Sequence, residues 1–127
     1  MAQNVHDLIV WQRAIELTVC IYKLTRSFPK DELYGLTSQM RRASVSVASN
    51  IAEGRGRLNS AEFRQFLGIS QGSIFELKTQ LLVARRLKMA DEQPLIEADS
   101  LSEEVSKMLA SINEKLRPAQ KKLRAES

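Results

Sequence analysis

The chain has 127 residues, which is enough for one domain around a single hydrophobic core. Its single cysteine excludes a disulfide framework within the chain, and its single histidine, His6, leaves no histidine cluster for a metal ion. The formal net charge of +4 permits an acidic partner such as nucleic acid without requiring one. No apolar run approaches the ~18 residues that a membrane span needs. We therefore expect a soluble intracellular protein with no membrane partner.

Apolar residues recur with helical spacing in four segments, and no segment alternates for long enough to predict a strand. We predict helices over residues 8–27, 36–53, 60–88 and 92–116, followed by a frayed tail over residues 119–127. Asn59 and Glu62 have capping-box spacing, and Gly54 suits a left-handed residue after the second helix. Because the connections are short, we predict an all-α fold, an antiparallel up-down-up-down four-helix bundle forming one domain over residues 1–127.

The first predicted helix is apolar around an unusually wide arc. One stripe consists of Leu8, Trp11, Ile15, Thr18 and Tyr22, and the stripe beside it of Val10, Ala14, Leu17, Ile21 and Leu24. Together they cover roughly 200°, about twice the apolar arc of an ordinary surface helix. We interpret the extra stripe as a self-association surface and assign to it Val10, Leu17, Ile21 and Leu24. The alternative is a deeply buried helix, or a few stray apolar residues on its surface.

The second and third helices carry ledges of polar and small residues beside their core rows. The polar row of the second helix is Gln39, Arg42, Ser46, Asn50 and Glu53, and the ledge of the third is Gly68, Gly72, Thr79 and Val83, with Glu76 at its edge. Because a glycine inside a helix costs about 1 kcal/mol relative to alanine, we expect a close approach at Gly68 and Gly72. We interpret the ledges as packing or subunit-contact surfaces, with interface residues Gln39, Arg42, Ser46, Asn50, Glu53, Gly72 and Glu76.

Side chains suited to catalysis are few. A serine or cysteine nucleophile would depend on His6, which precedes the first helix, and Cys20 has no obvious base nearby in the sequence. Glu53 and Glu76 would form a carboxylate pair if their ledges faced each other, although arginine more often satisfies such residues. We therefore predict a non-enzymatic protein with no catalytic residue, no metal site and no cofactor.

Charge is segregated along the last third of the sequence. Residues 91–104 contain six acidic residues and no basic one, whereas residues 115–124 contain five basic residues and no acidic one. In the predicted topology, the connection after the second helix lies at the same end as both termini. We define this basic end by Arg55, Arg57, Arg64, Lys115, Arg117, Lys121, Lys122 and Arg124. Such a surface suits nucleic-acid phosphates, and the alternative is a solvated charged end.

Several spaced motifs are similar to those of a known family. They are Leu8-x-x-Trp11-Gln12-x-Ala14, Phe28-Pro29, Tyr34-Gly35-Leu36-Thr37-x-Gln39-x-Arg41-Arg42-Ala43, Ser46-x-x-x-Asn50-Ile51-Ala52-Glu53-Gly54, Glu62-Phe63 and Gly72-Ser73-x-x-Glu76-Leu77. From Leu8 to Lys88 the chain thus resembles the four-helix bundle proteins encoded in intervening sequences of bacterial 23S rRNA genes, also called the S23 family. The resemblance implies a bacterial cytoplasmic homopentamer with a role linked to ribosomal RNA and no established enzyme activity. It supplies no binding residues.

These observations lead to one functional hypothesis and one alternative. We expect a non-enzymatic oligomer that binds structured RNA, or another nucleic acid, through its basic end. The chain has only seven aromatic residues, mostly on core stripes, so we expect phosphate and shape contacts rather than base recognition. The alternative is a structural or protein-interaction scaffold with no role in nucleic-acid binding.

Overall fold

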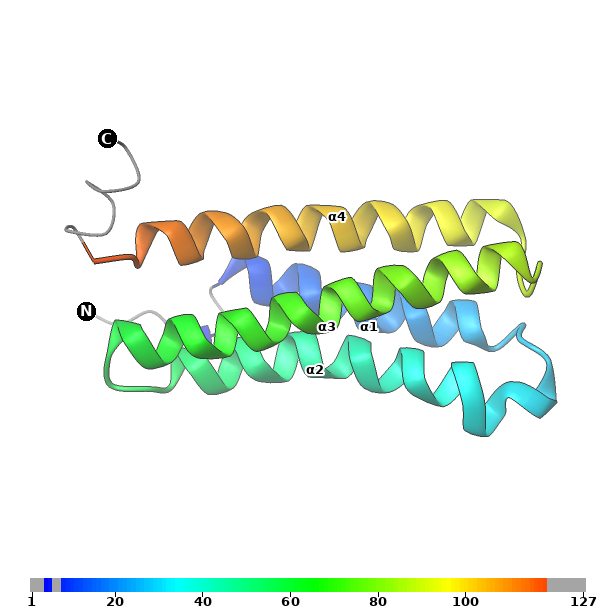
Figure 1. Cartoon of the computed structure of the whole chain (residues 1–127), viewed down its shortest axis with the longest axis horizontal. Helices are drawn as coiled ribbons and strands as arrows, with labels where there is room; N and C mark the ends of the chain where they lie inside the picture. Colours follow the sequence, from blue (N-terminus) through cyan, green and yellow to red (C-terminus); the bar gives the residue numbers. More distant parts are fainter. Residues whose placement is uncertain (1–3, 6–7, 119–127) are drawn as a thin grey trace.

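A computed structural model describes residues 4–5 and 8–118, which form a bundle of four antiparallel helices (Figure 1). The helices are α1 (Ile9–Thr25), α2 (Ser38–Arg55), α3 (Ser60–Arg86) and α4 (Glu92–Lys115). A 3₁₀ turn, η2 (Lys30–Glu32), and a π-helical segment, η3 (Leu33–Thr37), connect α1 to α2. Within these residues there is no strand, and the predicted all-α, four-helix fold is confirmed. Each observed helix end lies within two residues of its predicted position.

The helices follow one another around the bundle, with α1 beside α2 and α4, and α3 beside α2 and α4. The connection between α2 and α3 lies at the same end as the end of α4, whereas the other two connections lie at the opposite end (Figure 1). Lys115, at the end of α4, is therefore separated from the acidic start of that helix by the length of the bundle.

The stripe of α1 that we interpreted as a self-association surface faces the core of its own chain. Its residues have relative accessibilities of 0–4% and are Val10, Ala14, Leu17, Ile21 and Leu24. In the other stripe, Ile15 and Tyr22 are exposed and Trp11 is half-buried. The assignment of Val10, Leu17, Ile21 and Leu24 to a subunit interface is therefore wrong. Both stripes have helical spacing, but α2 and α4 cover the Val10–Leu24 stripe fully and the other only in part, where Thr18 Oγ1 donates to the Ser44 carbonyl oxygen at 3.0 Å.

Glycine at position 54 allows α2 and α3 to approach closely. A Cβ atom there would lie 2.6 Å from Phe66 Cβ and 2.9 Å from Phe63 Cδ1. The helix continues through Gly54 to Arg55, and Gly56 follows it with a φ of −78°. Gly54 therefore serves interhelical packing, and its prediction as a left-handed helix stop is wrong. The cap of α3 is confirmed, since the Asn59 side chain accepts a hydrogen bond from the Glu62 backbone N–H at 2.9 Å.

Candidate nucleic-acid interface

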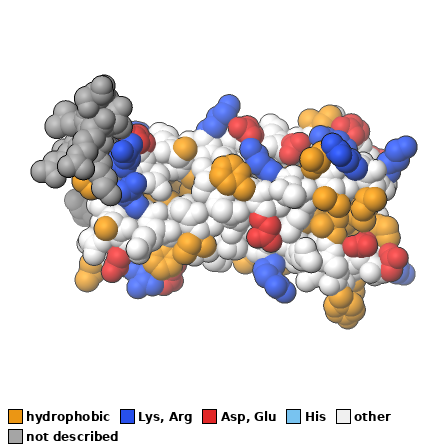
Figure 2. All heavy atoms as spheres, in the orientation of Figure 1, with side chains coloured by type: hydrophobic (Ala, Val, Ile, Leu, Met, Phe, Trp, Pro, Cys, Tyr) orange, Lys and Arg blue, Asp and Glu red, His pale blue; other side chains and the backbone are white. Residues whose placement is uncertain are grey.

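Three parts of the chain bring cationic side chains to one end of the bundle. Arg55 and Arg57 lie where α2 ends, Arg64 lies in the second turn of α3, and Lys115 and Arg117 lie where α4 ends. Blue side chains are visible at this end in Figure 2, beside the end of α4. Topology thus brings together five of the predicted basic residues. The other three, Lys121, Lys122 and Arg124, lie outside the described residues.

Hydrogen bonds between α3 and α4 hold part of this end together. Arg64 Nε donates to Asn113 Oδ1 at 2.8 Å, and Asn113 Nδ2 donates to the Arg64 carbonyl oxygen at 3.4 Å. The start of α3 is therefore fixed to the last turns of α4. A planar guanidinium presents five N–H donors, so Arg64 retains donors beyond the one that Asn113 accepts.

The remaining arginines differ in what already engages them. Arg57 forms an ion pair with Glu53, and its guanidinium lies 4.8 Å from the centroid of the Phe66 ring. Arg117 pairs with Glu114 at 3.0 Å. Arg55 is half-buried, and its side chain makes no hydrogen bond or ion pair to any residue the structure describes. An anion can therefore contact Arg55 without displacing a partner, whereas Arg57 and Arg117 would exchange weak surface pairs for it.

The predicted interface residues on α2 and α3 share one side of the bundle and differ in exposure. Five are exposed, namely Gln39, Arg42, Glu53, Gly72 and Glu76, and two are half-buried, namely Ser46 and Asn50. Asn50 Nδ2 donates to the carbonyl oxygen of Ser46 at 2.8 Å, and Ser73 Oγ donates to Ser46 Oγ at 2.9 Å. The polar centre of this α2–α3 face is therefore satisfied within one chain.

The two glycines of α3 face open space. No atom lies within 4 Å of a Cβ built at Gly68 or Gly72 in the described part of the chain. The close approach predicted at these positions is thus absent within one bundle. Apolar side chains around them are exposed, at 51% for Ile69, 56% for Phe75 and 41% for Val83. This part of α3 is a shallow apolar surface available to another molecule.

The two candidate carboxylates do not form a pair. Glu53 pairs with Arg57, and Glu76 Oε1 accepts a hydrogen bond from Gln80 Nε2 at 3.3 Å. The Ser46–Ser73 hydrogen bond sets the antiparallel register, which places Glu53 and Glu76 about ten residues, or ~15 Å, apart along the bundle. The hypothesis of a paired-carboxylate site is therefore wrong, and an arginine, Arg57, satisfies Glu53.

Residues 6–111 match the family model described as 23S rRNA-intervening sequence protein. The chain belongs to this family. Its structure is similar to a crystal structure described as a protein with unknown function from the S23 ribosomal protein family of Bacteroides thetaiotaomicron. The TM-score is 0.75 and the sequence identity 23%, and the match covers 83% of this chain and 98% of the other. This likeness shows the fold. No curated protein matches the chain.

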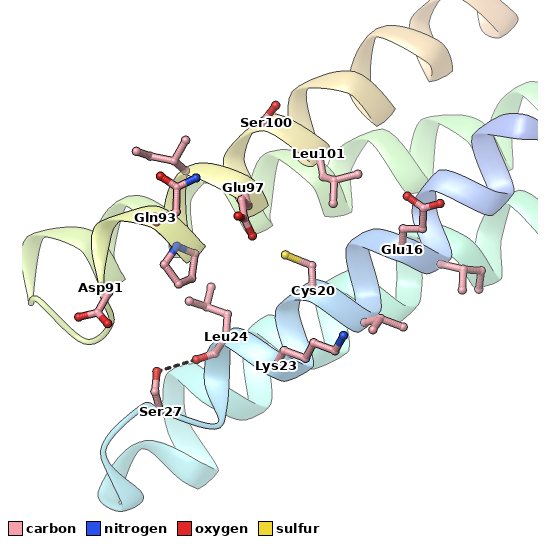
Figure 3. Close-up of a pocket in the computed structure, with 14 residues that line it drawn as sticks. Glu16, Cys20, Lys23, Leu24, Ser27, Asp91, Gln93, Glu97, Ser100 and Leu101 are labelled. Atoms are coloured by element: carbon pink, nitrogen blue, oxygen red, sulfur yellow. Dashed lines mark hydrogen bonds between the residues drawn. The ribbon is translucent and has the colours of Figure 1, made fainter.

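A groove between α1 and α4 was not predicted. It encloses about 1030 Å³, and its apolar wall includes Ile15, Val19, Leu24, Ile96 and Leu101. Cys20 and Glu97 point toward one another across it (Figure 3). Burial, followed by the negative charge of Glu97, raises the pKa of the Cys20 thiol, and Lys23 opposes this shift. Of the exposed stripe of the first helix only Ile15 lines this groove, so that stripe did not locate it.

Two further observations concern metal binding and membrane spanning. Among residues 4–5 and 8–118, no group of three or more His, Cys, Asp or Glu side chains is placed to hold a metal ion. No helix in those residues is both long and apolar enough to cross a membrane. His6 lies outside them.

Proposed function

We propose that this chain is a non-enzymatic, self-associating bundle that binds structured RNA through its basic end. The observation that carries the proposal is the convergence of cations from α2, α3 and α4 at one end. The family name links its members to intervening sequences of 23S rRNA, which favours RNA over other polyanions. Our proposed assembly is the homopentamer that the family resemblance implies. Such a ring would repeat the basic end five times and multiply its attraction for phosphates.

Phosphate oxygens are the groups that these cations would contact. Arg55 provides donors without an internal partner, and Arg64 is held in position by Asn113. The nearby aromatic Phe66 is half-buried beneath the Arg57 guanidinium, so it offers no open platform for stacking a base. The arrangement therefore favours the RNA backbone and its shape, with weak preference among sequences.

The α2–α3 face is our proposed surface for self-association. The core-facing stripe of α1 is unavailable, whereas Gly68 and Gly72 form a shallow strip on α3 beside Ile69 and Phe75. Two glycines inside a helix cost about 1 kcal/mol each, which a close intermolecular contact would offset. Sedimentation of the full chain should give five times the mass of one chain, and Phe75→Glu should lower it. A monomer at micromolar concentration would contradict this part of the proposal.

The RNA proposal is tested by binding of an rRNA-derived stem-loop to the full chain over a range of salt. Four phosphate contacts would give a slope of log K against log salt of about −3 to −4. Replacing Arg55 and Arg57 together by Glu should weaken binding at least about tenfold, since it removes two of those contacts. The matched control replaces Arg86 and Lys88 by Glu, which changes the charge equally at the other end of the bundle. Equal losses in both variants, or a flat salt dependence, would contradict the proposal.

A protein-interaction scaffold is the second candidate. Its support is the set of exposed apolar side chains on two sides of the bundle, with Ile69 and Phe75 on α3 and Ile15 and Val19 on α1. Isolated exposed apolar residues are ordinary, but contiguous ones mark contact surfaces. If the chain self-associates and binds the stem-loop no more tightly than an unrelated protein of equal charge, the scaffold is the better account.

A further inference from the structure

The groove between α1 and α4 lies away from the proposed RNA surface. It extends from Ile15 on α1 to Ser27 just after that helix, and from Asp91 just before α4 to Leu101 on it, in the half of the bundle remote from the basic end. Val19 and Ile96 on its wall have exposed fractions of 47% and 44%. Apolar walls of this extent favour an occupant that brings apolar surface of its own.

The charge around the groove is mostly negative and only partly neutralised within the chain. Its lining includes the carboxylates of Glu16, Asp91 and Glu97 and a single cation, Lys23. Arg13 pairs with Glu16. Within the described residues, the carboxylates of Asp91 and Glu97 make neither a hydrogen bond nor an ion pair. On a chain of net charge +4, this is a local site for a partly apolar cation.

Other acidic residues of α4 form ion pairs within the chain, unlike Asp91 and Glu97 at the groove. Arg85 contacts Glu92 at 3.1 Å and Asp99 at 3.5 Å, and Lys78 pairs with Glu103. The unpaired carboxylates of the acidic segment are therefore concentrated where the apolar wall is open. Apolar surface and unneutralised negative charge coincide there.

The chain itself contains a segment of matching chemistry. Residues 119–127 carry three cations, Lys121, Lys122 and Arg124, around one large apolar residue, Leu123, with a single acid, Glu126. This segment begins after Pro118, at the end of the bundle opposite the groove. Leu123 lies seven residues after Leu116, a span of at most ~25 Å when fully extended, and Leu101 is ~22 Å from Leu116 along α4. Leu123 could therefore reach the groove of its own chain only through a fully extended segment, a constraint that the groove of a second copy does not impose.

We propose that the α1–α4 groove binds residues 119–127 of a second copy of this chain. Leu123 contacts the Ile15, Val19 and Ile96 wall, and the neighbouring cations lie near Asp91 and Glu97. The contact is heterologous, because the tail and the groove are different surfaces at opposite ends of the bundle. It is weak for a separate peptide and gains strength from effective concentration within an assembly. It goes beyond the proposed RNA function and does not depend on it.

The single cysteine makes this contact testable in the full chain. Cys20 lines the groove, so Leu123→Cys places a second thiol where the proposal requires it. Under copper–phenanthroline oxidation, we expect a disulfide between Cys20 of one copy and the introduced thiol at position 123 of another, identified by mass spectrometry. The matched control is Leu58→Cys, which places a fully exposed thiol in the α2–α3 connection. Its yield of links to Cys20 should be several-fold lower.

Charge variants decide whether the link reports a specific contact. In the Leu123→Cys chain, Glu97→Lys or replacement of Lys121 and Lys122 by Glu should lower the yield to that of the Leu58→Cys control. Glu114→Lys, an equal charge change at the far end of α4, should leave it unchanged. An excess of a peptide of residues 118–127 should suppress the link.

Each contrary result overturns the proposal. Equal yields for Leu123→Cys and Leu58→Cys, or a disulfide within one chain, exclude an intermolecular tail contact. A predominant link between the Cys20 thiols of two copies shows that the groove packs against another groove. A Glu97→Lys variant that keeps Leu123 should bind the rRNA stem-loop with the same affinity as the unsubstituted chain. Loss of the link with retained RNA binding therefore refutes only this inference.

Discussion

Two long seams on opposite sides of the bundle, α2–α3 and α1–α4, are built differently. At α2–α3, Gly54 permits close approach to Phe66, and Ser70 Oγ donates to the Val47 carbonyl oxygen at 2.8 Å. At α1–α4, branched side chains such as Ile15 and Ile96 line a groove of about 1030 Å³. Small residues let two helices close on each other, whereas large side chains directed outward leave the second seam open.

This difference separates residues that stabilise one chain from residues available to a partner. Residues at the closed seam are buried or hydrogen-bonded and should contribute to the free energy of unfolding. The exposed residues of the open seam, such as Ile15 and Ile96, already contact water, so their truncation should cost the single chain little. Their effect should instead appear in measurements of association. Pairs of substitutions, one at a buried residue and one at an exposed residue, test whether stability and association depend on different residues.

The largest contrast is expected between two apolar residues of α1. Leu17 is fully buried, so Leu17→Ala should lower the free energy of unfolding by about 2–5 kcal/mol. Ile15 lines the groove and is 39% exposed, so Ile15→Ala should cost less than about 1 kcal/mol. Chemical denaturation of both variants measures the difference. Comparable losses would show that the groove wall is part of the folded core.

A second contrast concerns a glycine of the closed seam and a glycine on the open surface of α3. Gly54→Ala should destabilise the bundle by about 1–3 kcal/mol, because the new methyl group would overlap Phe66 and Phe63. Gly68→Ala should stabilise a monomer by up to about 1 kcal/mol, because its Cβ enters open space in a helix interior. Thermal unfolding at low protein concentration compares them. The same sign for both would contradict the assignment of Gly54 to the closed seam.

The smallest stability contrast compares two serines. Ser70→Ala removes the buried hydrogen bond to Val47 and should cost about 1 kcal/mol. Ser100 is exposed in the groove lining, so Ser100→Ala should change stability by less than about 0.5 kcal/mol. Urea denaturation midpoints at a constant m-value give the change in the free energy of unfolding for both variants. A loss at Ser100 equal to that at Ser70 would place a structural hydrogen bond in the groove.

Sequence periodicity was sufficient for the fold. It predicted the four helices with each end within two residues of its observed position. It failed for α1, where two adjacent stripes have the same period. Only the positions of α2 and α4 decide which stripe is covered, and those positions depend on residues far away in the chain.

The candidate sites show the same limit. The basic end was predictable because helix direction alone places Arg55, Arg64 and Lys115 at one end. The partners of its arginines were not, since Asn113 lies 49 residues from Arg64 in the sequence. Gly54 was misread because a glycine near a helix end suits either a turn or a close contact. The groove required the distance between α1 and α4, which no local pattern encodes.

The last test concerns the thiol at the groove. Burial and then Glu97 raise the pKa of Cys20, so its thiolate is scarcer in the folded chain than in the unfolded chain at the same pH. Alkylation by iodoacetamide at pH 8 should therefore be slower for the folded protein than for the protein in urea. A raised folded pKa also means that stability declines as pH rises above about 9.0, the ordinary value for this thiol, where the unfolded chain ionises first.

Replacing Glu97 by Gln should lower the pKa of Cys20 part of the way to its ordinary value. The substitution removes the carboxylate charge but keeps the burial, which contributes most. The pH profile of Cys20 alkylation should move to lower pH, and the matched variant Glu103→Gln should leave it in place, since Glu103 is engaged by Lys78. No movement with Glu97→Gln would show that burial alone raises the pKa of Cys20 and that the Glu97 charge does not act on the thiol.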